Sequence, residues 1–282
     1  MVLLVVVSLL WAFSFGLIKR HLGGVDSTLV AALRLGLSLL VFLPLLRPQK
    51  LRLGTAGRLV GIGALQFGVM YLAYIESYRH LRAYEAALFT ITTPLFVTLL
   101  ADLLDRRWRP LALVAALLAI AGTGFVVARS AELRVTLAGL LLVQLSNAAF
   151  AAGQVLYRRL RTQEPDLRDR EVFGLLYAGG AAVALVALVW RAPSLALTAP
   201  QWLTLLYLGI VASGAGFFLW NVGATRVSAG TLAVMNNAKV PLGVAASLLV
   251  FGETADPAAL AGSMALFLAA LWIAGRAERE PS

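Results

Sequence analysis

The chain has 282 residues, of which 60% are hydrophobic and only 13% charged, whereas an ordinary soluble domain has about 25% charged residues. The net charge of +10 does not indicate nucleic-acid binding, because the basic residues are dispersed over short connections between apolar runs, where they act as topology signals. The absence of cysteine excludes disulfides, thiolate metal sites and cysteine nucleophiles.

Ten apolar segments predict ten transmembrane helices, because about 20 helical residues cross a hydrocarbon core of about 30 Å. In chain order they are residues 2–18, 27–46, 58–78, 84–104, 110–128, 135–157, 171–190, 200–220, 228–250 and 257–275. The first segment lacks a basic leader and an Ala-x-Ala-like cleavage site, so we expect a retained helix. The predicted fold class is therefore all-α and integral to the membrane.

Short connections join these segments, and the longest, residues 158–170, is a charged linker between the two halves of the chain. An even number of helices places both termini on one side of the membrane. Of the 24 Lys and Arg residues, 15 flank the segments on that side and seven flank them on the other. Because cytoplasmic connections carry the positive excess, we predict a bacterial-type inner-membrane protein whose linker, termini and tail (276–282) are cytoplasmic.

The two halves of the chain resemble each other. Pro94 and Pro241 are 147 residues apart, and two further pairs of residues share that offset. Each half holds five helices, an odd number, so the second half is inverted relative to the first. Inverted repeats characterise secondary transporters, whose substrate site lies near the midplane at the repeat interface. We therefore predict two inverted five-helix repeats, the first over about 1–128 and the second over about 135–157 together with 171–275.

The second helix and the closing part of each half carry a family pattern. Residues 90–127 and 236–275 resemble the closing segment of an EamA repeat, and residues 27–46 resemble the second helix of that family, with Arg34 at its characteristic arginine. The chain thus resembles the drug/metabolite transporter superfamily over nearly its whole length. This resemblance implies a ten-helix exporter of amino acids or other small metabolites. The aromatic content resembles the aromatic-amino-acid exporter branch.

Lys239 lies in the middle of the ninth segment and is the foremost candidate for a site residue. A charge at that depth costs at least about 2.5–3.5 kcal/mol on insertion scales, and intramembrane ionisable residues are functional by default. The neighbouring Asn236 and Asn237 favour a wet cavity, in which the lysine would attract a carboxylate or titrate during the transport cycle. Alternatively, backbone carbonyls near Pro241 satisfy the ammonium group. Arg34 lies nearer a helix end, so we expect a structural charge that snorkels or clamps a neighbouring helix.

Aromatic and amide side chains recur at helical spacing and provide the remaining candidates for the transport pathway. The aromatic candidates are Trp11, Phe15, Tyr71, Tyr74, Tyr78, Phe89, Phe217 and Trp220. The further amide candidates are Asn147, Gln154 and Asn221. Rings would stack on an apolar substrate or attract its ammonium group, and amides would hydrogen-bond its polar end. The alternatives are interfacial or core packing for the rings and an interhelical clasp for the amides.

The function expected from these features is transport. Pro94 and Pro241 would kink the fourth and ninth helices at matching depths, and no mid-membrane Asp or Glu supports a carboxylate proton relay. No catalytic or metal-ligand motif is present, so we predict no enzyme, cofactor or metal. The hypothesis is a secondary transporter that exports small amphipathic metabolites, with amino acids, aromatic ones included, as substrates. Nucleotide sugars, amines and polyamines are alternative substrates, and a membrane-embedded enzyme is a remote alternative.

The expected partners follow from that hypothesis. They are a small-molecule substrate and the lipid bilayer, with no nucleic acid. A monomer is expected rather than an oligomer.

Overall fold

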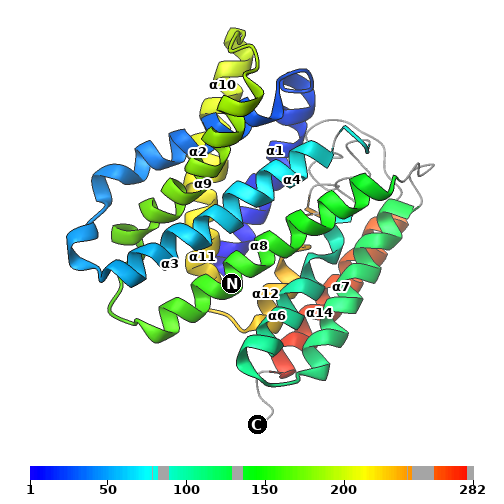
Figure 1. The fold of residues 1–282 in the computed structure, drawn as a ribbon. Helices are drawn as coiled ribbons and strands as arrows, with labels where there is room; N and C mark the ends of the chain where they lie inside the picture. Colours follow the sequence, from blue (N-terminus) through cyan, green and yellow to red (C-terminus); the bar gives the residue numbers. More distant parts are fainter. Residues whose placement is uncertain (78, 82–88, 129–135, 240, 243–256, 278–282) are drawn as a thin grey trace.

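The computed structural model describes residues 1–282 except 78, 82–88, 129–135, 240, 243–256 and 278–282, and every regular element it describes is helical (Figure 1). The first half comprises α1 (Val2–His21), α2 (Ser27–Phe42), η1 (Leu43–Leu45), η2 (Pro48–Lys50), α3 (Leu53–Gly63), η3 (Ala64–Val69), α4 (Met70–Ser77), η4 (Thr90–Thr92), α6 (Thr93–Asp105) and α7 (Pro110–Ala128). The second half comprises α8 (Leu137–Gln163), α9 (Asp169–Arg191), α10 (Ala199–Tyr207), η5 (Leu208–Ala215), α11 (Gly216–Ala224), α12 (Ala229–Met235) and α14 (Pro257–Ala277).

These elements follow the predicted segments closely. Five helical stretches of the described chain are each long and apolar enough to cross a bilayer: Ser27–Leu45, Leu53–Ser77, Leu137–Gln163, Asp169–Arg191 and Ala199–Ala224. About half of each apolar stretch is buried inside the bundle, so the other half forms the surface that lipid would cover. The helices α7 and α14, which close the two halves, lie side by side (Figure 1).

The third and eighth spans are each interrupted by a π-helical segment. The segment η3 joins α3 to α4 and packs on α9, and η5 joins α10 to α11 and packs on α2. A Cβ atom on Gly63 would lie 1.9 Å from the carbonyl oxygen of Leu176, and one on Gly179 would lie 2.0 Å from that of Val60. Only glycine fits at these distances, so α3 and α9 meet backbone to backbone. We call this contact, formed by these four residues, the glycine seam.

The ninth span is not the continuous helix that hydropathy predicts over residues 228–250. The helix α12 ends at Met235, residues 236–238 form a turn, and the chain is helical again at Lys239. Asparagine side chains compete for backbone hydrogen bonds and favour turns over helix interiors. Hydropathy averages over such residues, which explains why the interruption was not predicted.

The fourth span has a matching interruption, because the 3₁₀ turn η4 precedes α6. Pro94 lies in the first turn of α6, where proline starts a helix rather than bending an unbroken one. The amide of Asn237 donates to the carbonyl oxygen of Ile91 at 2.9 Å. The two interruptions therefore contact each other, as the discontinuous helices of secondary transporters do.

The helix α8 extends six residues beyond its predicted end, to Gln163, and α9 begins at Asp169. The predicted linker 158–170 therefore shortens to residues 164–168, because Arg158, Arg159 and Arg161 belong to the last turns of α8. Arg161 Nε, for example, lies 2.8 Å from Asp169 Oδ1. We call this end of the bundle the linker side.

The opposite end of the bundle, which we call the distal side, is held by a second group of ion pairs. Arg191 at the end of α9 lies 2.7 Å from Glu76 on α4 and 3.5 Å from Asp26. Asp26 also caps α2 by accepting from the backbone N–H of Thr28. These contacts join three spans at one point.

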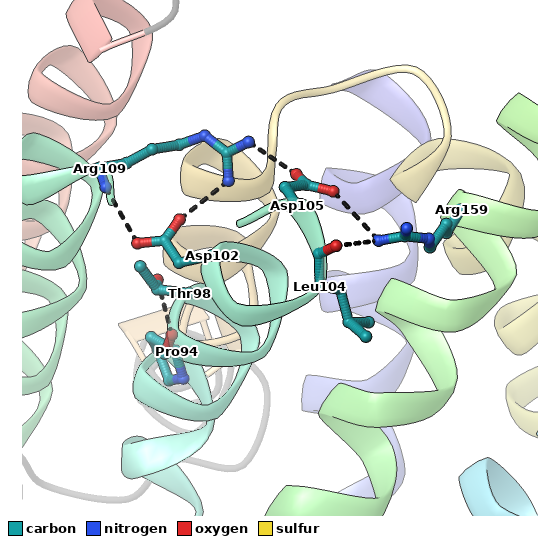
Figure 2. A network of polar contacts seen from close by, with 7 residues as sticks. All are labelled: Pro94, Thr98, Asp102, Leu104, Asp105, Arg109 and Arg159. Carbon is teal, nitrogen blue, oxygen red and sulfur yellow. Dashed lines mark hydrogen bonds and ion pairs between the residues drawn. The ribbon is translucent and has the colours of Figure 1, made fainter. Parts of the chain in front are cut away.

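Asp102 is a nearly buried carboxylate on the linker side. Figure 2 shows Arg109 between two acids, with Nη1 2.9 Å from Asp102 Oδ1 and Nη2 2.6 Å from Asp105 Oδ2. Arg159 on α8 contacts Asp105 and the carbonyl oxygen of Leu104 (Figure 2). The side chain of Asp102 is only 6% exposed, so water does little to stabilise its negative charge. Arg109 contributes most of that stabilisation, because it donates to both carboxylate oxygens.

Replacing this arginine should test the network. We expect Arg109→Met to destabilise the protein by about 3 kcal/mol, because removing one partner of a buried pair leaves an uncompensated charge. Thermal unfolding of the purified protein in detergent measures the loss. The double variant Asp102→Asn/Arg109→Met should recover part of it, and equal melting temperatures for the single and double variants would contradict this account.

Candidate functional site

Spans from both halves line a cavity of about 120 Å³. Its walls are formed by Trp11, Ser14, Ile18, Arg34, Met70, Tyr71, Tyr74, Thr90, Thr93, Ser146, Asn147, Phe150, Phe217 and Lys239. Ligand pockets usually measure about 300–1,000 Å³, so this cavity must widen to hold a metabolite. Two larger hollows lie at the ends of the bundle, about 770 Å³ beside Arg109 and about 600 Å³ beside Arg191.

Two cations, Lys239 and Arg34, border the cavity. Lys239 Nζ is 5.9 Å from the ring centroid of Trp11, and Arg34 Cζ is 4.7 Å from that of Tyr71, both within cation–π range. Arg34 Nε also donates to Ser213 Oγ at 3.0 Å, so the residue expected to be purely structural both bonds a neighbouring span and lines the cavity. Within the described part of the chain, no ion pair joins either cation to a carboxylate.

Four rings, those of Trp11, Phe150, Phe217 and Trp220, form a cluster that we call the aromatic floor. The Trp11 centroid lies 4.9 Å from Trp220 and 5.3 Å from Phe217, and the Phe150 centroid lies 6.0 Å from Phe217. Trp11 Nε1 donates to the carbonyl oxygen of Ala212 at 2.9 Å, which fixes the ring. Trp220 is buried behind the other three, which line the cavity. The floor presents rings on which a substrate ring would stack.

Asn147 is a predicted amide that the structure places in the cavity wall. Its Nδ2 donates to the carbonyl oxygen of Phe89 at 2.8 Å and to Thr92 Oγ1 at 2.9 Å. Phe89, a predicted aromatic candidate, therefore contacts Asn147 through its backbone carbonyl oxygen. Tyr71 and Tyr74 also border the cavity, which leaves their proposed role in substrate contact open to test.

The other predicted amides, Gln154, Asn221, Asn236 and Asn237, are buried away from the cavity, with exposed fractions of 2% or less. Gln154 and Asn236 bond each other. Asn221 donates to the carbonyl oxygen of Phe217 in its own helix at 2.9 Å. Their contact with a substrate remains a prediction, because none of them borders the cavity in this state.

Two further predicted residues cannot be compared with the cavity, because Tyr78 and the side chain of Phe15 lie outside the described part of the chain. Several residues of the wall were not predicted from the sequence: Ser14, Met70, Thr90, Thr93 and Ser146. The 147-residue offset between the halves places Thr92 at the position of Lys239. Comparing the halves position by position would therefore have pointed to the threonines around η4.

Two halves with interrupted helices that meet beside a charged cavity are the architecture of a secondary transporter. A family model described as the EamA-like transporter family matches residues 1–128 and 137–275. The chain belongs to the EamA-like transporter family. Membership confirms the resemblance and the predicted fold class, an all-α membrane protein with ten transmembrane helices in two inverted five-helix repeats.

This EamA-like chain is similar along nearly its whole length to bacterial proteins. It is 42% identical over 280 residues to a Salmonella typhimurium protein named biotin transporter, covering 97% of this chain and 92% of that protein. An Escherichia coli K12 protein of the same name is 42% identical over 279 residues, with the same coverage. A Pseudomonas aeruginosa protein named probable biotin transporter is 43% identical over 281 residues, covering 98% of each chain.

A solved structure described as "Crystal structure of protein" is 23% identical to this EamA-like chain, with a TM-score of 0.79. The match covers 99% of this chain and 98% of the solved one. That likeness concerns the fold alone. The family makes the chain a multi-pass membrane transporter of a small molecule. The names of the relatives do not support amino-acid export and favour the alternative of another small metabolite.

Proposed function

We propose that the chain transports biotin. Biotin combines a carboxylate, an apolar chain and a compact fused ring that contains a urea. Lys239 and Arg34 would complement the carboxylate, and the aromatic floor would contact the ring. The observation that carries the proposal is this pair of cations in an aromatic wall, in a chain 42–43% identical to proteins named biotin transporter or probable biotin transporter.

The charges of the wall favour an anion over an amino acid. The described lining contains two cations and no Asp or Glu. The ammonium group of an amino acid would face like charges there, with only ring faces to attract it. A monocarboxylate is attracted by both cations, and two unit charges 4 Å apart attract by about 4 kcal/mol at an effective dielectric constant of 20.

Transport requires the cavity to open alternately to each side. The wall extends along α1 from Trp11 distally to Ile18, so the aromatic floor separates the cavity from the linker side. The glycine seam lets spans of the two halves slide with their backbones in contact. Because the linker side carries the positive excess, we place it in the cytoplasm, so that substrate entering from the distal side is taken up.

Uptake of labelled biotin into proteoliposomes tests the proposal, with labelled phenylalanine and threonine in parallel. We expect saturable entry of biotin that excess unlabelled biotin suppresses and excess phenylalanine does not. Protein-free liposomes set the background, and imposing a pH gradient shows whether protons drive entry. Saturable entry of phenylalanine without entry of biotin would overturn the proposal and restore the amino-acid hypothesis.

A further inference from the structure

Two amides lie one helical turn beyond the cavity, on the linker side. On α8, Gln154 follows Phe150 by four residues, and on the ninth span Asn236 precedes Lys239 by three. Four helical residues rise about 6 Å, and on the ninth span the turn at residues 236–238 separates Asn236 from Lys239. Because α8 runs toward the linker side and α12 runs away from it, both amides lie on the same side of their cavity-lining neighbours.

These amides form a reciprocal pair. Gln154 Nε2 donates to Asn236 Oδ1, and Asn236 Nδ2 donates to Gln154 Oε1, both at 3.2 Å, which is the long end of the usual range. Two groups of the aromatic floor hold Gln154 in place: Trp220 Nε1 donates to its Oε1 at 2.8 Å, and its Nε2 donates to the carbonyl oxygen of Phe150 at 3.2 Å. The donor and the acceptor of Gln154 are therefore fixed side by side.

We propose that this pair is a second binding site on the transport path, at which Gln154 and Asn236 receive the adjacent N–H and C=O groups of a urea or amide. Each amide presents to the other the same donor–acceptor edge that a cyclic urea presents. A urea that enters between the two amides breaks their two mutual hydrogen bonds and forms two new ones, its C=O accepting from Gln154 Nε2 and its N–H donating to Asn236 Oδ1. Trp220 still donates to Gln154 Oε1, and Asn236 Nδ2 still donates to the carbonyl oxygen of Leu232, so the exchange costs little. A ligand without the N–H leaves the buried Asn236 Oδ1 unpaired. Where the ligand is biotin, with its urea ring, the inference rests on the proposed function.

The transport test compares biotin with its analogue methylated at the ureido nitrogens, in the wild type and in Asn236→Leu. This substitution leaves Gln154 bonded to Trp220 and Phe150. The wild type should transport biotin with a kcat/KM at least about tenfold higher than that of the analogue, because a buried hydrogen bond is lost with the analogue. Asn236→Leu should bring this ratio close to one, and an unchanged ratio would overturn the inference.

Gln66→Leu is the matched control for that comparison. Gln66 is a fully buried amide on η3, packed on Gly153 next to the pair, and its side chain has no hydrogen-bond partner among the described residues. Removing it should leave the ratio of the two substrates at the wild-type value. Loss of the ratio in this variant as well would mean that any buried amide at this depth sets it, which contradicts the inference.

A binding test separates the inference from the proposed function. It measures the melting temperature of the purified protein with 2-imidazolidinone, a bare cyclic urea, and with its N,N′-dimethyl derivative. The cyclic urea should stabilise the wild type and Gln66→Leu but not Asn236→Leu, and the dimethyl derivative should stabilise none of them. If biotin is not transported but this pattern holds, the proposed function fails and the second site stands. If biotin is transported without this pattern, the second site fails alone.

A folding defect in Asn236→Leu would not leave the site undecided. Asn236→Ala removes the donor and the acceptor of the amide and is smaller than leucine, so it takes the place of the leucine variant in both tests. The same losses are expected, and retention of both the substrate ratio and the stabilisation by cyclic urea would overturn the inference.

Discussion

Lys239→Met should reduce kcat/KM for biotin by about 100-fold and leave the protein folded. A hydrogen bond to a charged group contributes about 1.5–3 kcal/mol, which corresponds to roughly ten- to 150-fold. Methionine has a similar length and is apolar, so the variant also avoids the cost of about 2.5–3.5 kcal/mol for a charge at this depth. Initial rates in proteoliposomes measure the first effect, and thermal unfolding, which we expect at an equal or higher temperature, measures the second.

Lys239→Arg is the control, because it keeps the positive charge beside Trp11. It should retain more transport than the methionine variant, although the wider guanidinium fits differently. Transport by Lys239→Met at the wild-type rate, together with a lower melting temperature, would show the opposite of what we expect. The ammonium group would then be a structural group satisfied by backbone carbonyls, and the carboxylate would need another partner.

Gly63→Ala should destabilise the protein by about 3 kcal/mol or more and prevent normal accumulation in the membrane. The added Cβ atom would lie 1.9 Å from a backbone oxygen of α9. A backbone atom cannot rotate away as a side chain can, so the two helices must separate, and the cost falls at or above the upper end of that measured for overpacked cores. Membrane yield and the melting temperature in detergent report the loss.

Gly61→Ala provides a control on the same helix. A Cβ atom at Gly61 would meet no atom within 4 Å, and alanine favours a helix over glycine by about 0.5–1 kcal/mol. This variant should therefore match the wild type or exceed it in stability. If Gly61→Ala and Gly63→Ala lost stability equally, flexibility of α3 rather than its contact with α9 would be the reason for its glycines.

Much of the fold could be predicted because a bilayer restricts what a chain can do. Each span needs about 20 apolar residues, so hydropathy located the segments, and the shared offset indicated the repeat. The turn at residues 236–238 was missed because it depends on hydrogen bonds, such as that from Asn237 to Ile91, which carry no signal in hydropathy. The end of α8 was missed for a related reason, since its last arginines look like a loop until their partners are known.

The site was partly predictable on the same physical ground. A charge in the middle of a span marked Lys239, and the structure places it in the cavity wall. Arg34 was treated as structural because distance from a helix end does not reveal which neighbour a side chain faces. The substrate could not be read from the aromatic content, because rings suit many apolar ligands. What discriminates between ligands is the charge that surrounds the rings, and that is known only once the spans are packed.

The π-helical segments change the angular phase of the spans that carry them. A π turn accommodates an additional residue, so side chains beyond it are rotated by about 100° from where an uninterrupted α-helix would aim them. This phase shift lets α3 present Gly63 to α9 while α4 directs Tyr71 and Tyr74 at the cavity. Deleting one residue from η3 would therefore re-aim that part of the wall without altering any residue in it. An insertion or deletion at η3 or η5 is thus a route by which a transporter of this fold can change which side chains face its cavity without any substitution in the spans.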